Sequence, residues 1–154
     1  MKTLLAALVV AFTLSAMAQD PVYPVKNLRY ISERDYRTEV LDSEKYVVMV
    51  FSNDSCLERV IVDRTCWMFE KKFDYFVPKF SPSVKVVGFN TNFENYLVVR
   101  DFNIKKDPTV VIMIKGKVYK RFEPNYAPRP QGTVGLMWQD QLLKDVLEVV
   151  SQIR

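Results

Sequence analysis

The chain contains no histidine among its 154 residues. This absence excludes a Ser-His-Asp triad, a Cys-His dyad and every metal site that needs an imidazole ligand. The net charge is only +4 and no block of five or more like charges occurs, so the pattern gives no indication of nucleic-acid binding. Cysteine is scarce too, because Cys56 and Cys66 are the whole complement. We expect no cofactor and no metal.

Apolar residues are plentiful: 49% of the chain is hydrophobic and 13% is aromatic, enough for one packed core. The first residues, MKTLLAALVVAFTLSAMAQD, place a lysine, an apolar run and a small-residue Ala-Met-Ala site in the order of a secretory signal peptide. The sequence therefore predicts a signal peptide over 1–18 and one domain over 19–154. We expect export to a periplasm or to the outside, where disulfides persist, a monomer, and no membrane span after cleavage.

Strand and helix patterns alternate along the rest of the chain. Three runs are apolar on both faces, which is typical of strands buried in a sheet that helices cover: KYVVMVF (45–51), VKVVGFN (84–90) and PTVVIMI (108–114). A short strand precedes a helix over 33–41, KGK forms a turn before the strand VYKRFE, and a last helix covers 135–153. This order predicts an α/β three-layer sandwich around a mixed sheet of about five strands.

A further amphipathic helix begins at Cys66 and ends or bends near Pro78. Phe69, Phe73, Phe76, Val77 and Phe80 recur at spacings of three and four, which gives the helix an apolar face. The same pattern assigns the charged residues to the opposite, polar face: Glu70, Lys71, Lys72, Asp74 and Lys79.

The chain resembles the thioredoxin-like family, including protein disulfide isomerase domains, over residues 25–153. VVMVFSNDSC is similar to the family strand that delivers the first active-site cysteine to a helix, and Cys56 takes that position. KDPTVVIMIKGKVYKRF is similar to the segment that runs from the family's cis-proline through the last hairpin, and Pro108 takes that position. VVGFNTNFENYLVVRDFNI, between them, is similar to the third strand and helix.

Three departures from the family pattern bear on activity. Nine residues separate Cys56 from Cys66, where thioredoxins have two. Val50 stands where the family has a buried acid, so we expect no buried carboxyl to serve the second thiol. Asp107 precedes the proline in place of a small apolar residue.

The pairing of Cys56 with Cys66 depends on the segment between them. Ser55 and Glu58 form a capping-box pattern that would start a helix at Cys56. An unbroken helix would separate the two Cα atoms by about 15 Å, whereas a disulfide needs them within about 7 Å. The β-branched run over 60–62 favours an interruption and a fresh helix at Cys66. We predict a Cys56–Cys66 disulfide, which is either a catalytic pair or a structural staple.

Two functions remain open at this point. The first is a thiol–disulfide oxidoreductase that acts on other exported proteins, with Cys56 and Cys66 as its catalytic pair. The resemblance implies that Asp107, Pro108 and Thr109 would line its substrate groove. The second is a non-catalytic protein-binding module that keeps the scaffold and a structural disulfide. Its protein partner would bind either the groove around Pro108 or the loop PNYAPRPQGT (124–133).

Overall fold

A computed structural model of the chain describes residues 26–53, 64–91, 95–125 and 138–153. Five strands form one sheet in the order β1-β3-β2-β4-β5. β1, β3 and β2 run parallel, and β4 and β5 are antiparallel to their neighbours. The strands are β1 (Arg29–Tyr30), β2 (Tyr46–Ser52), β3 (Val84–Asn90), β4 (Thr109–Ile114) and β5 (Lys117–Phe122). The mixed five-stranded sheet predicted from the sequence is confirmed.

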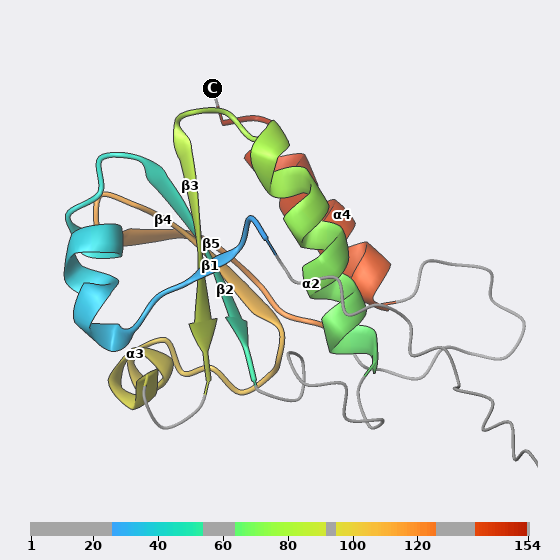
Figure 1. The fold of residues 1–154 in the computed structure, drawn as a ribbon, viewed down its shortest axis with the longest axis horizontal. Helices are drawn as coiled ribbons and strands as arrows, with labels where there is room; N and C mark the ends of the chain where they lie inside the picture. The colour runs from blue at the N-terminus through green and yellow to red at the C-terminus, as the bar shows by residue number, and fades with distance from the viewer. Residues whose placement is uncertain (1–25, 54–63, 92–94, 126–137, 154) are drawn as a thin grey trace, which may run out of the picture.

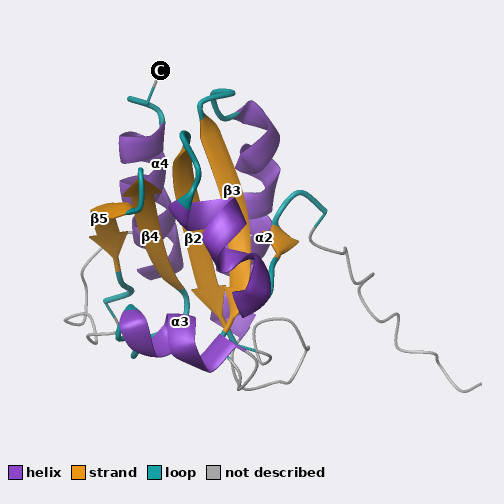
Figure 2. Cartoon of the chain, turned by 90° about the vertical axis from the view of Figure 1, so that its left-hand side faces the viewer, coloured by secondary structure: helices purple, strands orange, loops and turns teal. Residues whose placement is uncertain are grey.

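Helices cover both faces of this sheet (Figures 1 and 2). The α2 helix (Arg64–Phe76) and the α4 helix (Trp138–Val150) lie side by side on one face. The α3 helix (Tyr96–Asp101) and two short turns, η1 (Glu33–Asp35) and η2 (Arg37–Leu41), lie on the other. The short η3 turn (Val77–Lys79) contains Pro78 and follows α2, as the sequence predicts. No helix in these described stretches has both the length and the apolar character to cross a bilayer.

The helix expected over 33–41 is not a regular α-helix. The Asp35 carboxylate accepts hydrogen bonds from the Ser32 backbone N–H (3.4 Å) and hydroxyl (3.0 Å), and the first turn is a 3-10 turn. The Asp42 N–H then donates to the Arg37 carbonyl at 2.9 Å, closing a wider π-helical turn. Local polar groups at each end therefore set the hydrogen-bond pattern that periodicity alone did not predict.

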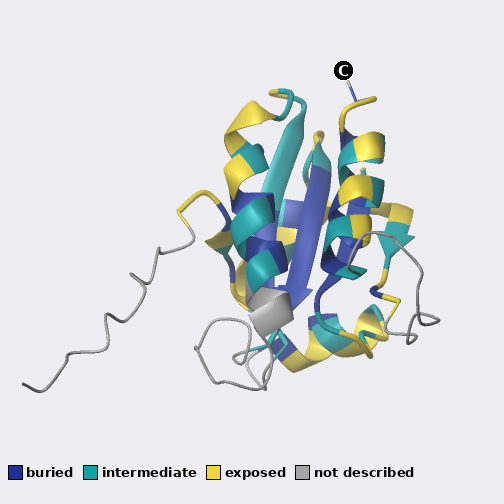
Figure 3. Cartoon of the chain, turned by 90° about the vertical axis from the view of Figure 1, so that its right-hand side faces the viewer, coloured by how far each residue is buried: buried dark blue, intermediate teal, exposed yellow. Residues whose placement is uncertain are grey.

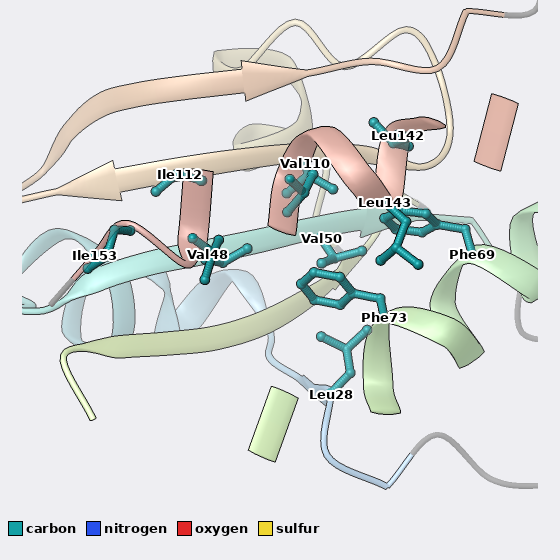
Figure 4. Packing of buried hydrophobic residues seen from close by; sticks show 12 residues of the cluster. Leu28, Val48, Val50, Phe69, Phe73, Val110, Ile112, Leu142, Leu143 and Ile153 are labelled. Carbon is teal, nitrogen blue, oxygen red and sulfur yellow. The ribbon is translucent and has the colours of Figure 1, made fainter. Parts of the chain in front are cut away.

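Side chains of β2 alternate between two hydrophobic clusters, one on each face of the sheet. Val48 and Val50 point to the cluster under α2 and α4, whereas Met49 and Phe51 point to the cluster under α3. Figure 3 shows the buried sheet behind the two long helices, whose outer faces are exposed. In Figure 4, Phe69 and Phe73 reach from α2 toward the sheet. β2 is therefore apolar on both faces because each face packs against a hydrophobic cluster, as the sequence predicts.

Two acids that the amphipathic pattern placed on the polar face of α2 are buried, which corrects that prediction. Glu70 is 0% exposed and Asp74 is 9% exposed. Asp74 accepts hydrogen bonds from the backbone N–H groups of Lys26 (3.2 Å), Asn27 (2.6 Å) and Leu28 (2.7 Å). These partners are 46–48 positions away in the sequence. A helical pattern reports hydrophobicity and cannot reveal such distant partners.

Candidate functional site

Three chain segments meet at the edge of the sheet where β2 and β3 end and β4 begins. β2 pairs with β4 so that Phe51 lies opposite Thr109, and it pairs with β3 so that Ser52 lies opposite Asn90. The Thr91 N–H donates to the Ser52 carbonyl at 2.8 Å. Residues that follow β2 and precede β4 are therefore held at one edge. The resemblance places a substrate groove at this edge.

Asp107 is the centre of a polar cluster at that edge. Its Oδ2 atom accepts hydrogen bonds from Asn53 Nδ2 at 3.2 Å and from Thr91 Oγ1 at 3.3 Å. The peptide bond between Asp107 and Pro108 is cis, the isomer that the resemblance implies. Pro108 and Thr109 are buried, and Thr109 Oγ1 donates to the Lys106 carbonyl at 2.6 Å. The structure therefore places all three predicted groove residues beside the end of β2.

The two cysteines are only partly covered by the structure. Cys56, with the capping box and the β-branched run after it, lies outside the described residues. Cys66 is the third residue of α2. The structure describes its backbone but not its side chain. The catalytic role and the disulfide of Cys56 and Cys66 stay predictions.

A second polar cluster lies inside the apolar layer between α2 and the sheet. The Tyr30 hydroxyl donates to Glu70 Oε1 and lies 2.8 Å from Ser52 Oγ. One network therefore joins a residue of β1, a residue of β2 and a residue of α2. Ser52 and Glu70 are both 0% exposed. The sequence predicts no buried carboxyl for the second thiol on the ground that Val50 replaces the family's acid. The structure nevertheless holds a buried carboxyl in this layer, that of Glu70 on α2.

The environment of this cluster favours protonated side chains. Burial raises the pKa of the Glu70 carboxyl, and the negative charge of Asp107 raises it further, while hydrogen bonds from Ser52 and Tyr30 oppose these effects. Burial also raises the pKa of Tyr30, and the Glu70 charge adds to that shift. Tyr30 therefore stays a neutral hydroxyl at ordinary pH, whereas Glu70 is the titrating group of the cluster.

Gly88 makes the network possible. Tyr30 pairs with Gly88 in the parallel register of β1 and β3, and the Tyr30 ring lies directly over this glycine. A Cβ at position 88 would come within 2.9 Å of the Tyr30 ring carbons Cδ1 and Cε1. The sequence carries a signal for this contact, because an isolated glycine inside a buried strand marks a close approach of another group.

We expect Gly88→Ala to lower the free energy of unfolding by about 1–3 kcal/mol, because the added methyl overpacks the space that the Tyr30 ring fills. Urea denaturation measures this difference. The matched comparison is the same substitution in a Tyr30→Ala background, where the obstacle is absent and little further loss is expected. Equal losses in both backgrounds would contradict this explanation.

Among the residues that the structure describes, no three His, Cys, Asp or Glu side chains come together as candidate metal ligands. The described chemistry consists of carboxyl, hydroxyl and amide groups around the end of β2.

Comparison with known proteins supports the fold. No protein-family model and no curated protein sequence matches the chain. Among solved structures, the chain is similar to thioredoxin f from spinach chloroplast in its long form, with a TM-score of 0.59 and 14% identity, over 80% of this chain and 86% of that one. It is also similar to Chlamydomonas reinhardtii thioredoxin f2, with a TM-score of 0.52 and 16% identity, over 62% of this chain and 82% of that one. Together with the sheet order and the helix layers, these similarities show that the chain has a thioredoxin-like fold.

Proposed function

We propose that this chain is an exported thiol–disulfide oxidoreductase that acts on cysteine pairs of other exported proteins through Cys56 and Cys66. The observation that carries the proposal is that the Asp107–Thr109 segment lies beside the end of β2, the strand that Cys56 follows in the sequence. The α2 helix, which contains Cys66, is linked to the end of β2 through the network of Glu70, Tyr30 and Ser52. The signal-peptide pattern of residues 1–18 supports export.

The proposed chemistry needs a thiolate at Cys56. This thiolate would attack a substrate disulfide, and Cys66 would then resolve the mixed disulfide, leaving the substrate reduced and the Cys56–Cys66 pair oxidised. A helix N-terminus favours a thiolate because its first N–H groups lack partners within the helix. Asp107, Pro108 and Thr109 would bind the substrate chain beside the pair.

The polar edge also suits the second candidate, a binding module with a structural disulfide. Asp107 presents a carboxylate held by Asn53 and Thr91, where the family has a small apolar residue. A fixed carboxylate can select a partner by charge and hydrogen bonding without any exchange of disulfides.

The reduction potential of the Cys56–Cys66 pair decides between these two functions. We expect a value between about −270 and −120 mV, the range of exchange enzymes, when the pair is equilibrated with glutathione and trapped thiols are counted by mass spectrometry. A Cys66→Ser variant should accumulate a mixed disulfide through Cys56, and a Cys56→Ser/Cys66→Ser variant is the control. A potential below about −300 mV would leave only the binding module.

A further inference from the structure

The strand β5 forms one edge of the sheet and pairs with β4 on its inner side. Figure 2 shows β5 at the outer side of the sheet, beside β4. No strand in the described residues pairs with the outer side of β5, so its backbone N–H and C=O groups on that side are open to another chain. The opposite edge is β1, which has two residues, whereas β5 has six. β5 therefore has the length of an ordinary strand and can pair with one.

The side chains of β5 are exposed over its first four residues, on both faces of the sheet. Val118 is 55% exposed and Tyr119 is 54% exposed, so two apolar side chains lie on the surface. Lys117 and Lys120 are exposed as well. Neither lysine forms an ion pair with any residue that the structure describes. Two ammonium groups and two apolar side chains are therefore available to a partner.

A β-bulge aligns the two lysines on one face of the sheet. Lys117 lies opposite Ile114, and Lys120 lies opposite Ile112. The lysines are three positions apart and the isoleucines two, so β5 has one extra residue, Tyr119, which has no Cα partner on β4. Because directly opposite residues share a face of the sheet, both lysines lie on the face of Ile112.

The pairing with β4 indicates what kind of strand fits across this bulge. A regular strand places residues two positions apart opposite Lys117 and Lys120, and such residues are about 7 Å from each other. The residue between them points to the other face, where Val118 lies opposite Met113. A complementary strand therefore carries two carboxylates two positions apart, with an apolar residue between them.

A second copy of this chain does not supply such a strand through β5. The strand reads KVYKRF, with three basic residues and no acidic one. Two β5 strands paired with each other would bring basic side chains together, and like charges opposite one another destabilise a strand pair. Lysines on edge strands protect natural sheets from this kind of self-association. The same charges attract an acidic strand, so they select among partners.

We propose that β5 binds an extended acidic segment of another protein as an additional edge strand, with two carboxylates opposite Lys117 and Lys120. Backbone hydrogen bonds along the edge would supply affinity, and the two ion pairs would fix the register. The apolar residue between the carboxylates would cover Val118. This binding needs no cysteine chemistry, so its failure and the failure of the proposed function are distinct results.

A synthetic peptide of strand length that alternates glutamate with valine tests the proposal. We expect its addition to shift the backbone amide signals of β5 in NMR spectra and to slow the exchange of β5 amide protons with solvent, because new backbone hydrogen bonds form there. Affinity should fall as the salt concentration rises. The control is a peptide of the same composition with all glutamates at one end, which should leave β5 exchange unchanged.

Charge reversal at the two lysines tests the register. The Lys117→Glu/Lys120→Glu variant should bind the alternating peptide at least about tenfold more weakly, and it should gain affinity for a peptide with lysine in place of glutamate. Both side chains are exposed, so the variant should fold. Lys144→Glu reverses a charge at an exposed site on α4 and should change affinity by less than about twofold.

Several results would overturn the proposal. One is equal affinity of the native protein and the Lys117→Glu/Lys120→Glu variant for the alternating peptide. Another is a set of amide shifts centred on elements other than β5. Vesicles of phosphatidylglycerol and phosphatidylcholine test a lipid surface: if they bind the native protein, lose binding in the same variant, and the peptide does not bind, the proposal is overturned in favour of a membrane.

Discussion

Replacing Phe73 by alanine is expected to lower the free energy of unfolding by about 3–5 kcal/mol. The Phe73 side chain is 0% exposed, and its ring stacks on Phe69 with centroids 5.7 Å apart. The Phe73 ring also contacts the Phe80 ring, with centroids 5.8 Å apart. Phe73 belongs to the hydrophobic cluster that joins α2 to the sheet. Truncation removes these contacts and leaves a cavity that the rigid strands cannot fill.

Urea denaturation of the Phe73→Ala variant checks this result. Tyr75 is the matched control because it lies two residues further along the same helix and is 64% exposed. Its ring contacts the Lys79 ammonium, with the nitrogen 3.4 Å from the ring centroid, so Tyr75→Ala is expected to cost no more than about 1 kcal/mol. A similar loss for both variants would show that α2 does not pack against the sheet through this face.

Replacing Asp74 by alanine is expected to cost about 3 kcal/mol. Three backbone N–H groups and the Asn27 side chain lose their acceptor, and the Leu28 N–H is buried with no other partner in the described network. Hydrogen bonds to a charged group contribute about 1.5–3 kcal/mol each, and the total is smaller than their sum because water reaches the more exposed donors.

Two measurements check the role of Asp74. The Asp74→Ala variant should unfold at lower urea and should be cut by trypsin at Lys26 faster than the native chain. Asp140→Ala, on α4, is the control. It removes an ion pair with Lys72, which lies on α2 like Asp74. Both side chains of this pair are partly exposed, and such pairs contribute about 0–1 kcal/mol. Equal rates of cleavage in native and Asp74→Ala proteins would contradict an anchoring role.

Sequence patterns predicted the sheet well because each strand follows a local rule. The run over 84–90 is β3 residue for residue, and the run over 45–51 differs from β2 by one position at each end. The two-residue turn at Lys115 and Gly116 has positive φ at both residues, as suits a tight hairpin. Apolarity on both faces, turn chemistry and strand length are properties of neighbouring residues, and a single sequence displays them.

The candidate site was harder to predict because its polar groups meet only in three dimensions. Tyr30, Ser52 and Glu70 come from β1, β2 and α2, and 40 positions separate Tyr30 from Glu70. A glutamate between phenylalanines was assigned to the polar face of its helix because glutamate is usually exposed. Gly88 was the available clue, since its missing side chain makes room for the Tyr30 ring. The position of Asp107 to Thr109 beside the end of β2 could be predicted through the resemblance because these residues are contiguous in sequence.

The central position of β2 has a consequence for how the protein opens. Its backbone is hydrogen-bonded to β3 on one side and β4 on the other, and residues 47–52 are fully buried. Amide protons in such a strand exchange with solvent only when the whole domain unfolds, whereas the two-residue edge strand β1 exchanges by local fraying. Partial opening at the periphery therefore leaves the end of β2 in place, together with Thr109, which is paired with it.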